Sequence, residues 1–438
     1  MPGVAGPGAL EGVRVLDFTR LGFGPQTTLI LGCLGARVIR VESSLHPDPI
    51  RVMPPYAPEA GERSKGFGNA SLAAISKATS LNRGGIFFKY NTGGKESIAV
   101  NARDPRGLDV LKRLVAVCDV VTESFAPGTL ERWGLTYGVM REQRPDIVYV
   151  SMSGFGHEGP DHRYLTMGPT AQALTGLTFL VGLPDRHPAG WSFSYLDHVG
   201  GYLGAVAVLA ALHHRRRTGE GQYVDVSQLE PGVGLTGTLL LDFAVNGRPS
   251  RRPGFPPGNR GIDPPAAPQG AYRAAGDERW VVISCRTDEQ WRALVGAMGD
   301  PAWAGDERFS TPAGRVEHAD ELDGLVGSWT RQRDRYDTMH LLQKAGVPAG
   351  AVQDARDRME TDPQLEARGH FTAVRHCEAG QLPLEGVPFG MSATPPATGG
   401  VIDRGPPCLG EDTEAVLTGL LGMDRDEVRH LADAGVLA

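Results

Sequence analysis

Residues 13–42 read VRVLDFTRLGFGPQTTLILGCLGARVIRVE, and their pattern decides the fold class. Apolar and β-branched residues open the stretch at Val13 and close it over residues 36–41, which is typical of two buried strands. Gly22 and Pro25 fall between them, and a proline suits the first turn of a helix because its missing N–H would have no partner there. The stretch therefore predicts a strand, a turn, a helix and a second strand, the repeating unit of a parallel sheet.

The same alternation continues along the chain. Further strands are expected over residues 119–122, 146–151 and 223–227, and helices over 106–117 and 195–217. The longer helix ends in three consecutive arginines, whose positive charges suit the negative pole of the helix dipole. Strands that alternate with helices predict an α/β sheet that is largely parallel.

A Pro/Gly-rich stretch interrupts this order. Residues 248–269 have no apolar periodicity, and we interpret them as a linker or an active-site loop. Beyond them, a strand over 280–284 and helices over 289–298 and 336–344 predict a second α/β region. At 438 residues the chain exceeds the usual size of one domain, so we expect two lobes or one large, elaborated fold.

Composition and charge narrow the class of protein. The residues are 41% hydrophobic and 22% charged, which suffices for a large core, and the net charge of −7 argues against nucleic acid as the main partner. No basic segment followed by an apolar one stands at the N-terminus, so no signal peptide is expected. The longest apolar run, over 200–212, is short and rich in small residues, so we expect no membrane partner and a cytoplasmic protein.

The cysteines predict neither a disulfide framework nor a zinc site, because no two of them have CxxC spacing. We expect reduced and mostly buried thiols in a reducing compartment, and no metal. The five are Cys33, Cys118, Cys285, Cys377 and Cys408.

One motif imitates a dinucleotide site. Gly22 and Gly24 follow a predicted strand, and Glu42 stands about twenty residues further on, as in a dinucleotide-binding fingerprint. The third glycine of the fingerprint, which allows helix and strand to pack closely, is missing because position 27 is Thr27. A tight turn between strand and helix explains the motif, and no nucleotide redox cofactor is expected.

A series of longer stretches, spread over nearly the whole chain, has a distinctive order and spacing. They are LEGVRVLDFTRLGFGP (10–25), LGARVIRVE (34–42), KESIAVNARDPRG (95–107), DVVTESFAPGTLERWGL (119–135), RPDIVYVSMSGFGHEGP (144–160), LAALHHRRRTGEGQYVDVSQLE (209–230), AGVPAGAV (345–352), DPQLEARGHF (362–371) and CLGEDTEAVL (408–417). Together they resemble the class III coenzyme A transferase family, which includes formyl-CoA transferase, carnitine-CoA transferase and α-methylacyl-CoA racemase.

The resemblance implies an α/β fold with a Rossmann-like large domain and a smaller α/β domain. It also implies an interlocked homodimer, in which two chains pass through each other as rings. On this basis residues 10–217 form the large CoA-binding domain with the nucleophile, and residues 218–269 the linker and active-site loop. Residues 270–360 form the small domain, and residues 361–438 return to the large domain.

The resemblance implies a catalytic role for Asp197. It lies in SYLDHVGGYLGAVAVLAAL (194–212), where the family has its nucleophilic aspartate. Taken alone, an aspartate just before an apolar helical run is first of all an N-cap. The two roles are compatible, because a helix N-terminus stabilises the anion that nucleophilic attack requires. The resemblance implies transfer of CoA from an acyl-CoA to a carboxylic acid, through an aspartyl anhydride and an aspartyl-CoA thioester.

The resemblance also indicates where CoA, a part of the acyl-CoA substrate, would bind. Arg103 and Arg132 are the natural phosphate partners, although surface solvation explains either one alone equally well. Phe125 would lie against the adenine or fill the core. The expected CoA contacts are Leu21, Gly22, Phe23, Val100, Asn101, Ala102, Arg103, Ser124, Phe125, Ala126 and Arg132, and the expected substrate pocket is Trp191, Tyr195, His198, Gly258 and Gly261.

Three departures limit what the family implies. The histidine that moves a proton in the racemase branch falls at Met167, and methionine cannot shuttle protons. Only Gly258 and Gly261 stand where formyl-CoA transferase has a run of glycines, which predicts a different acid or a stiffer flap. Ala126 and Ser43 replace basic residues of some relatives, so fewer CoA contacts are expected.

Two alternatives stay open. One is an acyl-CoA racemase or isomerase on the same fold, against which Met167 counts. The other is a non-catalytic CoA-binding subunit, against which the presence of Asp197 counts.

Overall fold

The computed structural model describes residues 8–56, 80–184, 186–191, 193–251, 253–260 and 264–438. The chain forms two compact units. Unit 1 comprises Met1–Thr178, Gly190–Leu241 and Gln364–Ala438, and unit 2 comprises Phe179–Ala189 and Asp242–Pro363. The domain boundaries expected from the sequence stay a prediction. Gly261 lies outside the described residues.

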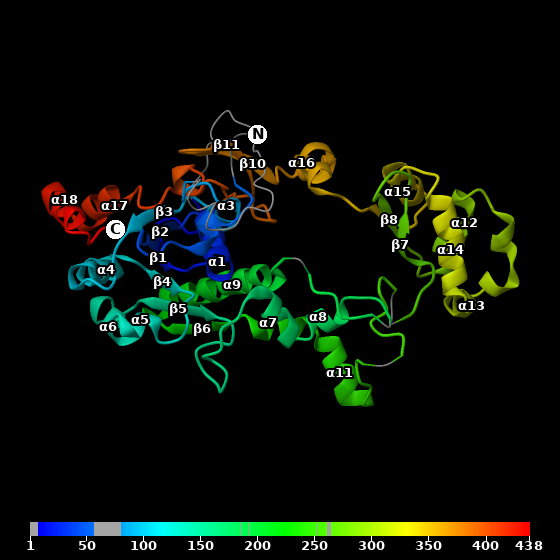
Figure 1. Ribbon diagram of the computed structural model, residues 1–438, viewed down its shortest axis with the longest axis horizontal. Coiled ribbons are helices and arrows are strands. Elements are labelled where there is room, and N and C mark those ends of the chain that lie inside the picture. Colours follow the sequence, from blue (N-terminus) through cyan, green and yellow to red (C-terminus); the bar gives the residue numbers. More distant parts are fainter. Residues whose placement is uncertain (1–7, 57–79, 185, 192, 252, 261–263) are drawn as a thin grey trace. The chain divides into compact units, whose positions relative to one another are not determined.

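Unit 1 is built on a parallel sheet of six strands in the order β3–β2–β1–β4–β5–β6 (Figure 1). Val15 pairs with Val38 on one side and with Val120 on the other, so β1 lies in the middle of the sheet. This order confirms the predicted α/β fold with a parallel sheet. The strands are β1 (Arg14–Phe18), β2 (Arg37–Glu42), β3 (Glu96–Ala99), β4 (Val120–Glu123), β5 (Val148–Ser153) and β6 (Tyr223–Ser227).

Each face of this sheet carries its own core, because successive strand residues point to opposite faces. Val15 belongs to a cluster with residues of α1 and α9, whereas Leu16 belongs to a cluster with residues of α4, α6 and α17. The sheet is therefore covered by helices on both faces, as parallel sheets require. The helices are α1 (Phe23–Cys33), α4 (Pro105–Val117), α6 (Tyr137–Gln143), α9 (Tyr195–Thr218) and α17 (Thr413–Leu421).

Glycines let α9 pack unusually close to α1. A β-carbon at position 200 would lie 2.6 Å from the ring of Phe23, and one at Gly204 would lie 2.4 Å from Oγ1 of Thr27. The Thr27 hydroxyl donates a hydrogen bond to the backbone oxygen of Gly201 at 2.9 Å. This close approach brings the beginning of α9 beside the beginning of α1, which positions the site described below.

Shorter elements complete unit 1 and its connections. The antiparallel hairpin of β10 (Phe371–His376) and β11 (Gly380–Glu385) belongs to its C-terminal segment. The remaining helices are α3 (Gly85–Asn91), α5 (Thr129–Arg132), α7 (Gly168–Leu174), α8 (Leu177–Leu180), α10 (Leu229–Leu235), α11 (Gly237–Asn246), α16 (Pro363–Ala367) and α18 (Arg425–Asp433).

Unit 2 has a three-stranded antiparallel sheet in the order β7–β8–β9, with Val281, Ile283 and Leu294 in its core. The strand and helices predicted after residue 280 are present, but this sheet is antiparallel. The expected linker over 218–269 begins with β6, α10 and α11, and the described residues between α11 and β7 lack helices and strands. The elements are β7 (Gln269–Arg273), β8 (Trp280–Ser284), β9 (Ala349–Ala351), α12 (Asp288–Ala297), α13 (Pro312–Glu317), α14 (Ala319–Thr330) and α15 (Arg335–Lys344).

The cysteines correct one expectation. Cys377 and Cys408 form a disulfide, although all five thiols were expected to be reduced. The two residues are 31 positions apart, a separation that carries no local spacing pattern, and Cys377 directly follows β10. His376 lies beside them, and its Nδ1 accepts hydrogen bonds from two backbone N–H groups, at Glu378 and Ala379. The other three are free and buried, as expected: Cys33, Cys118 and Cys285.

Helix α9 is longer than the apolar run that the sequence suggested. Among the described residues it is the one helix whose length and composition would suffice for a membrane span. Ala205, Val208 and Ala211 on this helix pack in the core against the sheet. A core helix of this kind can have the same length and apolar composition as a membrane span.

Candidate active site

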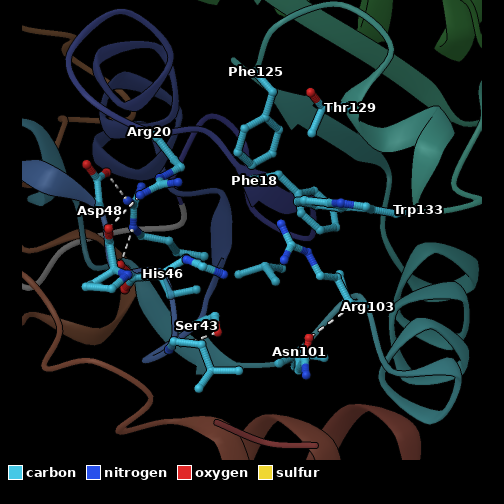
Figure 2. Close-up of a pocket in the computed structure, with 17 residues that line it drawn as sticks. Phe18, Arg20, Ser43, His46, Asp48, Asn101, Arg103, Phe125, Thr129 and Trp133 are labelled. Carbon is cyan, nitrogen blue, oxygen red and sulfur yellow. Dashed lines mark hydrogen bonds and ion pairs between the residues drawn. The ribbon is translucent and has the colours of Figure 1, made fainter.

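A cavity of about 560 Å³ opens where the central strands of the large sheet end (Figure 2). Its lining comes from the residues at and after the carboxyl ends of β1, β2, β3 and β4. Between β1 and β4 the connections change direction across the sheet, and ligands of open α/β sheets bind in the crevice at such a switch point. The strand order therefore indicates a binding site here.

Aromatic rings form one side of this cavity. Figure 2 shows Phe18, Phe125 and Trp133 gathered there, with the Arg103 side chain reaching toward them. Phe125 and Trp133 contact edge to face, with ring centroids 5.2 Å apart. Flat rings beside a cation suit a ligand that combines a planar base with negative charge.

The cations of the cavity differ in their freedom to bind a ligand. Arg40 is buried and donates to Asp48 at 2.6 Å and to the backbone oxygen of Thr19 at 2.8 Å. These donors are therefore used within the protein and not for a ligand. Arg20 donates to the backbone oxygen of Pro47. Arg103 is exposed, and none of the described residues forms an ion pair with its guanidinium, which leaves its donors for a ligand.

A buried carboxyl group, that of Glu123, stands two positions before Phe125 in the chain. Glu123 accepts a hydrogen bond from the backbone N–H of Phe125 at 2.6 Å and from the Tyr149 hydroxyl at 3.3 Å. Nε2 of His157 lies 3.2 Å from the same carboxyl group. Burial raises the pKa of Glu123 to about 8, so the group is protonated at neutral pH. A neutral Glu123 therefore anchors the backbone that presents Phe125 to the cavity.

The expected CoA contacts divide into two sets. Five line the cavity: Val100, Asn101, Ala102, Arg103 and Phe125. The rest do not: Leu21, Gly22, Phe23, Ser124, Ala126 and Arg132.

The second set has other contacts. The Phe23 side chain packs in the core beside Gly200, and its contact with CoA stays a prediction. Ser124 Oγ accepts from the backbone N–H of Arg20 at 2.8 Å and thereby braces the turn after β1. Arg132 donates to the Thr129 hydroxyl at 2.9 Å.

The turn between β1 and α1 links the cavity to a carboxylate. Arg20 lines the cavity, and Gly22 contacts the Asp197 side chain. Leu21 between them has φ of 63°, a backbone conformation that is costly for a branched side chain and is found mostly at functional sites. The Cα atoms of Arg20 and Gly22 are at most about 7 Å apart, so one short turn connects a residue that lines the cavity with one that contacts the carboxylate.

Asp197 is the third residue of α9, not its N-cap, which is Ser194. The N-cap expectation is therefore wrong. The carboxylate instead accepts a hydrogen bond through Oδ1 from the side-chain amide of Gln228. Burial raises the pKa of Asp197, and the side chains of Ser194 and Gln228 partly offset this effect. Its position in the first turn of α9, beside the first turn of α1, favours the anion through two helix dipoles.

His198 and Tyr90 form a pair next to this carboxylate. Nε2 of His198 lies 3.3 Å from the Tyr90 hydroxyl, and the two rings stack with centroids 5.5 Å apart. Burial lowers the pKa of His198 to about 4, so the imidazole is neutral at neutral pH. The negative charge of Asp197 adds to burial in raising the pKa of Tyr90, which keeps the phenol protonated.

The other expected pocket residues belong to both units. Trp191 and Tyr195 contact edge to face, with centroids 4.5 Å apart, close in sequence to Asp197. Gly258 belongs to unit 2, has φ of 66° and faces the Leu183 side chain. Met167 is exposed at the beginning of α7.

Sequence reasoning missed several residues of the site. Arg20, Arg40 and His46 follow or end the first two strands, and the rule that ligands bind at the carboxyl ends of strands would have pointed to them. Tyr90 and Gln228 carried no comparable signal, because each reaches the carboxylate from an element remote in sequence.

Comparisons with known proteins point to one family. The sequence model of CoA-transferase family III matches residues 10–413. The chain is 32% identical to succinyl-CoA–D-citramalate CoA-transferase of Chloroflexus aurantiacus, over 97% of both chains. It is 28% identical to formyl-CoA:oxalate CoA-transferase of Rhodopseudomonas palustris, over 98% of this chain and 97% of that one. A crystal structure of a CAIB/BAIF family protein from Brucella suis superposes with a TM-score of 0.80 at 30% identity, covering 95% of this chain and 100% of that chain.

Proposed function

The chain belongs to CoA-transferase family III, and we propose that it moves CoA from an acyl-CoA to a carboxylic acid through a covalent intermediate on Asp197. As a class III CoA transferase it exchanges a thioester between two acids. The problem for such an enzyme is to keep the energy of the thioester bond without losing it to water.

A carboxylate nucleophile meets this requirement. Oδ2 of Asp197 attacks the acyl-CoA carbonyl, the carbon–sulfur bond breaks, and CoA leaves as a thiolate. The thiolate then attacks the Asp197 carbonyl carbon of the mixed anhydride, which releases the donor acid and leaves an enzyme–CoA thioester. The acceptor acid reverses both steps. Anhydride and thioester conserve the bond energy, whereas an ester on a serine would dissipate it.

The observation that carries this proposal is the continuity of one turn. Arg20 lines the cavity and Gly22 contacts Asp197, so a CoA bound at the aromatic side would have its thioester end directed along this turn toward the carboxylate. Among the residues that line the cavity, Arg103 is the natural partner of a CoA phosphate, and Phe125 and Trp133 are the natural partners of its adenine.

We propose short dicarboxylic acids as the acceptor acids. The two transferases compared above are named for D-citramalate and oxalate, both dicarboxylic. A panel of acceptor acids of two to five carbons, offered with succinyl-CoA, tests the proposal by the rate of new acyl-CoA formation.

A homodimer is part of the proposal. Helix α11 is strongly apolar but buries none of its residues in one chain, and Leu241, Phe243 and Val245 are 61–70% exposed. A helix of this composition needs a partner surface. Light scattering after size exclusion would give twice the 46.7 kDa of one chain. A cytoplasmic location stays a prediction.

The covalent step has a direct test. The enzyme is mixed with acyl-CoA and then with hydroxylamine, and peptides are analysed by mass spectrometry. Modification at Asp197, together with its loss in Asp197→Ala, is the expected result. Undiminished CoA transfer by Asp197→Ala would overturn the mechanism. Exchange of the substrate α-hydrogen with deuterated water, without CoA transfer, would support the racemase alternative. CoA binding without either reaction would support a non-catalytic subunit.

A further inference from the structure

The side chain of Gln228 makes a contact that the proposed chemistry does not yet use. Gln228 is 5% exposed, and its Nε2 donates a hydrogen bond to Oδ1 of Asp197. A buried amide directed at a buried carboxylate forms a charge-assisted hydrogen bond, which is stronger than one between neutral groups. The question is which stage of the reaction this bond serves.

The backbone around Gln228 is fixed by two strands and a helix. Its N–H donates to the backbone oxygen of Ser153 at 2.9 Å, and the N–H of Leu229 donates to that of Gly154 at 3.0 Å. Gln228 follows β6 directly, and α10 begins at the next residue. Its amide is therefore held by regular structure on both sides, which is the condition for a preorganised donor.

A glycine lets α10 approach the beginning of α9. A β-carbon on Gly232 would lie 2.6 Å from the Thr175 side chain and 3.0 Å from that of Leu196, the neighbour of Asp197. The close packing of α10 on α9 is what brings the Gln228 amide to the carboxylate.

The two oxygens of Asp197 have different surroundings. Oδ1 accepts from Gln228, whereas Oδ2 faces the turn between β1 and α1, where a β-carbon on Gly22 would lie 2.5 Å away. The Tyr90 ring borders the same space, 3.2 Å from that position. Oδ2 is therefore directed toward this turn, and Oδ1 is directed toward Gln228.

We propose that Gln228 is the oxyanion donor for the steps that occur at the Asp197 carbonyl carbon. The inference rests on the proposed function, because it requires a covalent intermediate on Asp197. Oδ2 forms the anhydride bond, and Oδ1 becomes its carbonyl oxygen. When the CoA thiolate attacks the carbonyl carbon, the electron pair of the C=O bond moves to Oδ1. The charged Oδ1 accepts its hydrogen bond from Gln228 Nε2.

The intermediate then collapses with balanced atoms. The electron pair returns from Oδ1 to restore the C=O bond, the bond from the carbonyl carbon to Oδ2 breaks, and Oδ2 leaves in the carboxylate of the donor acid. The same donor acts again when the acceptor carboxylate attacks the enzyme–CoA thioester. No oxidant or further reactant is required.

Gln228→Met tests the donor with a side chain of similar size that cannot donate. Loss of a single oxyanion-hole donor lowers kcat by about 10²- to 10³-fold, and we expect a fall in this range with little change in KM for acyl-CoA. Rapid quenching should show accumulation of the aspartyl anhydride over the aspartyl-CoA thioester, because the second step is slowed. Gln343→Met is the control, because the Gln343 amide also donates a side-chain hydrogen bond, in its case to the backbone oxygen of Ala349, but belongs to unit 2.

Gln228→Glu provides a readout that a merely structural role would not move. At neutral pH two carboxylates would face each other, so activity should be low. At lower pH a protonated glutamic acid can donate to Oδ1, so the variant should gain activity as the pH falls, opposite to the wild type. The pH profile of Gln228→Glu tests the proposal even if Gln228→Met fails to fold.

The outcomes separate the two proposals. If Asp197→Ala is active, the covalent mechanism fails, and the role of Gln228 fails with it. If Asp197→Ala is inactive and the wild type is labelled at Asp197, but Gln228→Met keeps the wild-type kcat and Gln228→Glu keeps the wild-type pH profile, the role of Gln228 alone is overturned.

Discussion

A β-carbon on Gly22 would lie 2.5 Å from Oδ2 of Asp197. Real β-carbons do not approach an oxygen so closely, so this glycine leaves the space in front of the carboxylate open. The backbone itself does not demand glycine, because φ of Gly22 is −106°, which any residue adopts. The restriction is therefore one of space at the reacting group.

Gly22→Ala is predicted to lose activity while keeping its fold. The added methyl group displaces Oδ2, and a misplacement of about 1 Å at a reacting group costs about 10²-fold in rate. Steady-state kinetics and a thermal melt measure both properties. Gly138→Ala is the matched control, because the nearest atom to its new β-carbon is 3.7 Å away. A Gly22→Ala enzyme with the wild-type kcat would contradict the role of this space.

Arg103→Ala is predicted to raise KM for acyl-CoA about tenfold and to leave kcat nearly unchanged, because a charge-assisted hydrogen bond to a phosphate contributes about 1.5 kcal/mol. High salt should reduce the difference in KM between the wild type and Arg103→Ala, because salt screens the attraction between the guanidinium and the phosphate. Arg106→Ala is the control, since that guanidinium pairs with Asp104 at 2.8 Å. A large loss of kcat with an unchanged KM would place Arg103 in the chemistry instead.

Asp197→Asn is predicted to abolish CoA transfer and to raise the melting temperature at neutral pH. Burial raises the pKa of Asp197 above its ordinary value of 3.8, so the folded protein holds this proton more tightly than the unfolded chain. Wild-type stability therefore falls as the pH rises from 3.8 through the folded-state pKa. The gain from asparagine should vanish at acid pH, where the wild-type carboxyl is protonated.

Melting curves of Asp197→Asn and the wild type over a pH series measure this difference. The exposed Asp109 on α4 offers the control substitution Asp109→Asn. A stability gain that is the same at all pH values would show that the buried charge is not its cause.

Glu123→Gln is predicted to remove part of the alkaline instability of the protein. Burial raises the pKa of Glu123 from 4.5 to about 8, so its contribution to stability is present below pH 4.5 and is lost as the pH rises through 8. Glutamine keeps an oxygen for the N–H of Phe125 but cannot ionise. Unfolding midpoints from pH 6 to about 9, with the exposed Glu142→Gln as control, measure the effect. Equal pH slopes for the wild type and Glu123→Gln would refute it.

The sequence predicted the framework of the fold well because its signals are local. The strand Tyr223–Ser227 lies where it was expected, and the long helix differs by one residue, since it is Tyr195–Thr218. Periodicity and turn residues act over a few positions, and each can be read without knowledge of the partner strand. The antiparallel order of unit 2 and the bond from Cys377 to Cys408 depend on distant contacts and were not predicted.

For the site, the sequence determined the class of enzyme and indicated one candidate residue. The order of motifs indicated the family, and the family indicated Asp197. It did not determine which oxygen of Asp197 is free, because that depends on a hydrogen bond from the end of β6 and on a glycine in the turn after β1. Only the tertiary structure brings Gln228, Gly22 and Tyr90 around this carboxylate. Hydrogen bonds and close packing act over a few ångströms in space, and positions far apart in the chain carry no local pattern that reveals them.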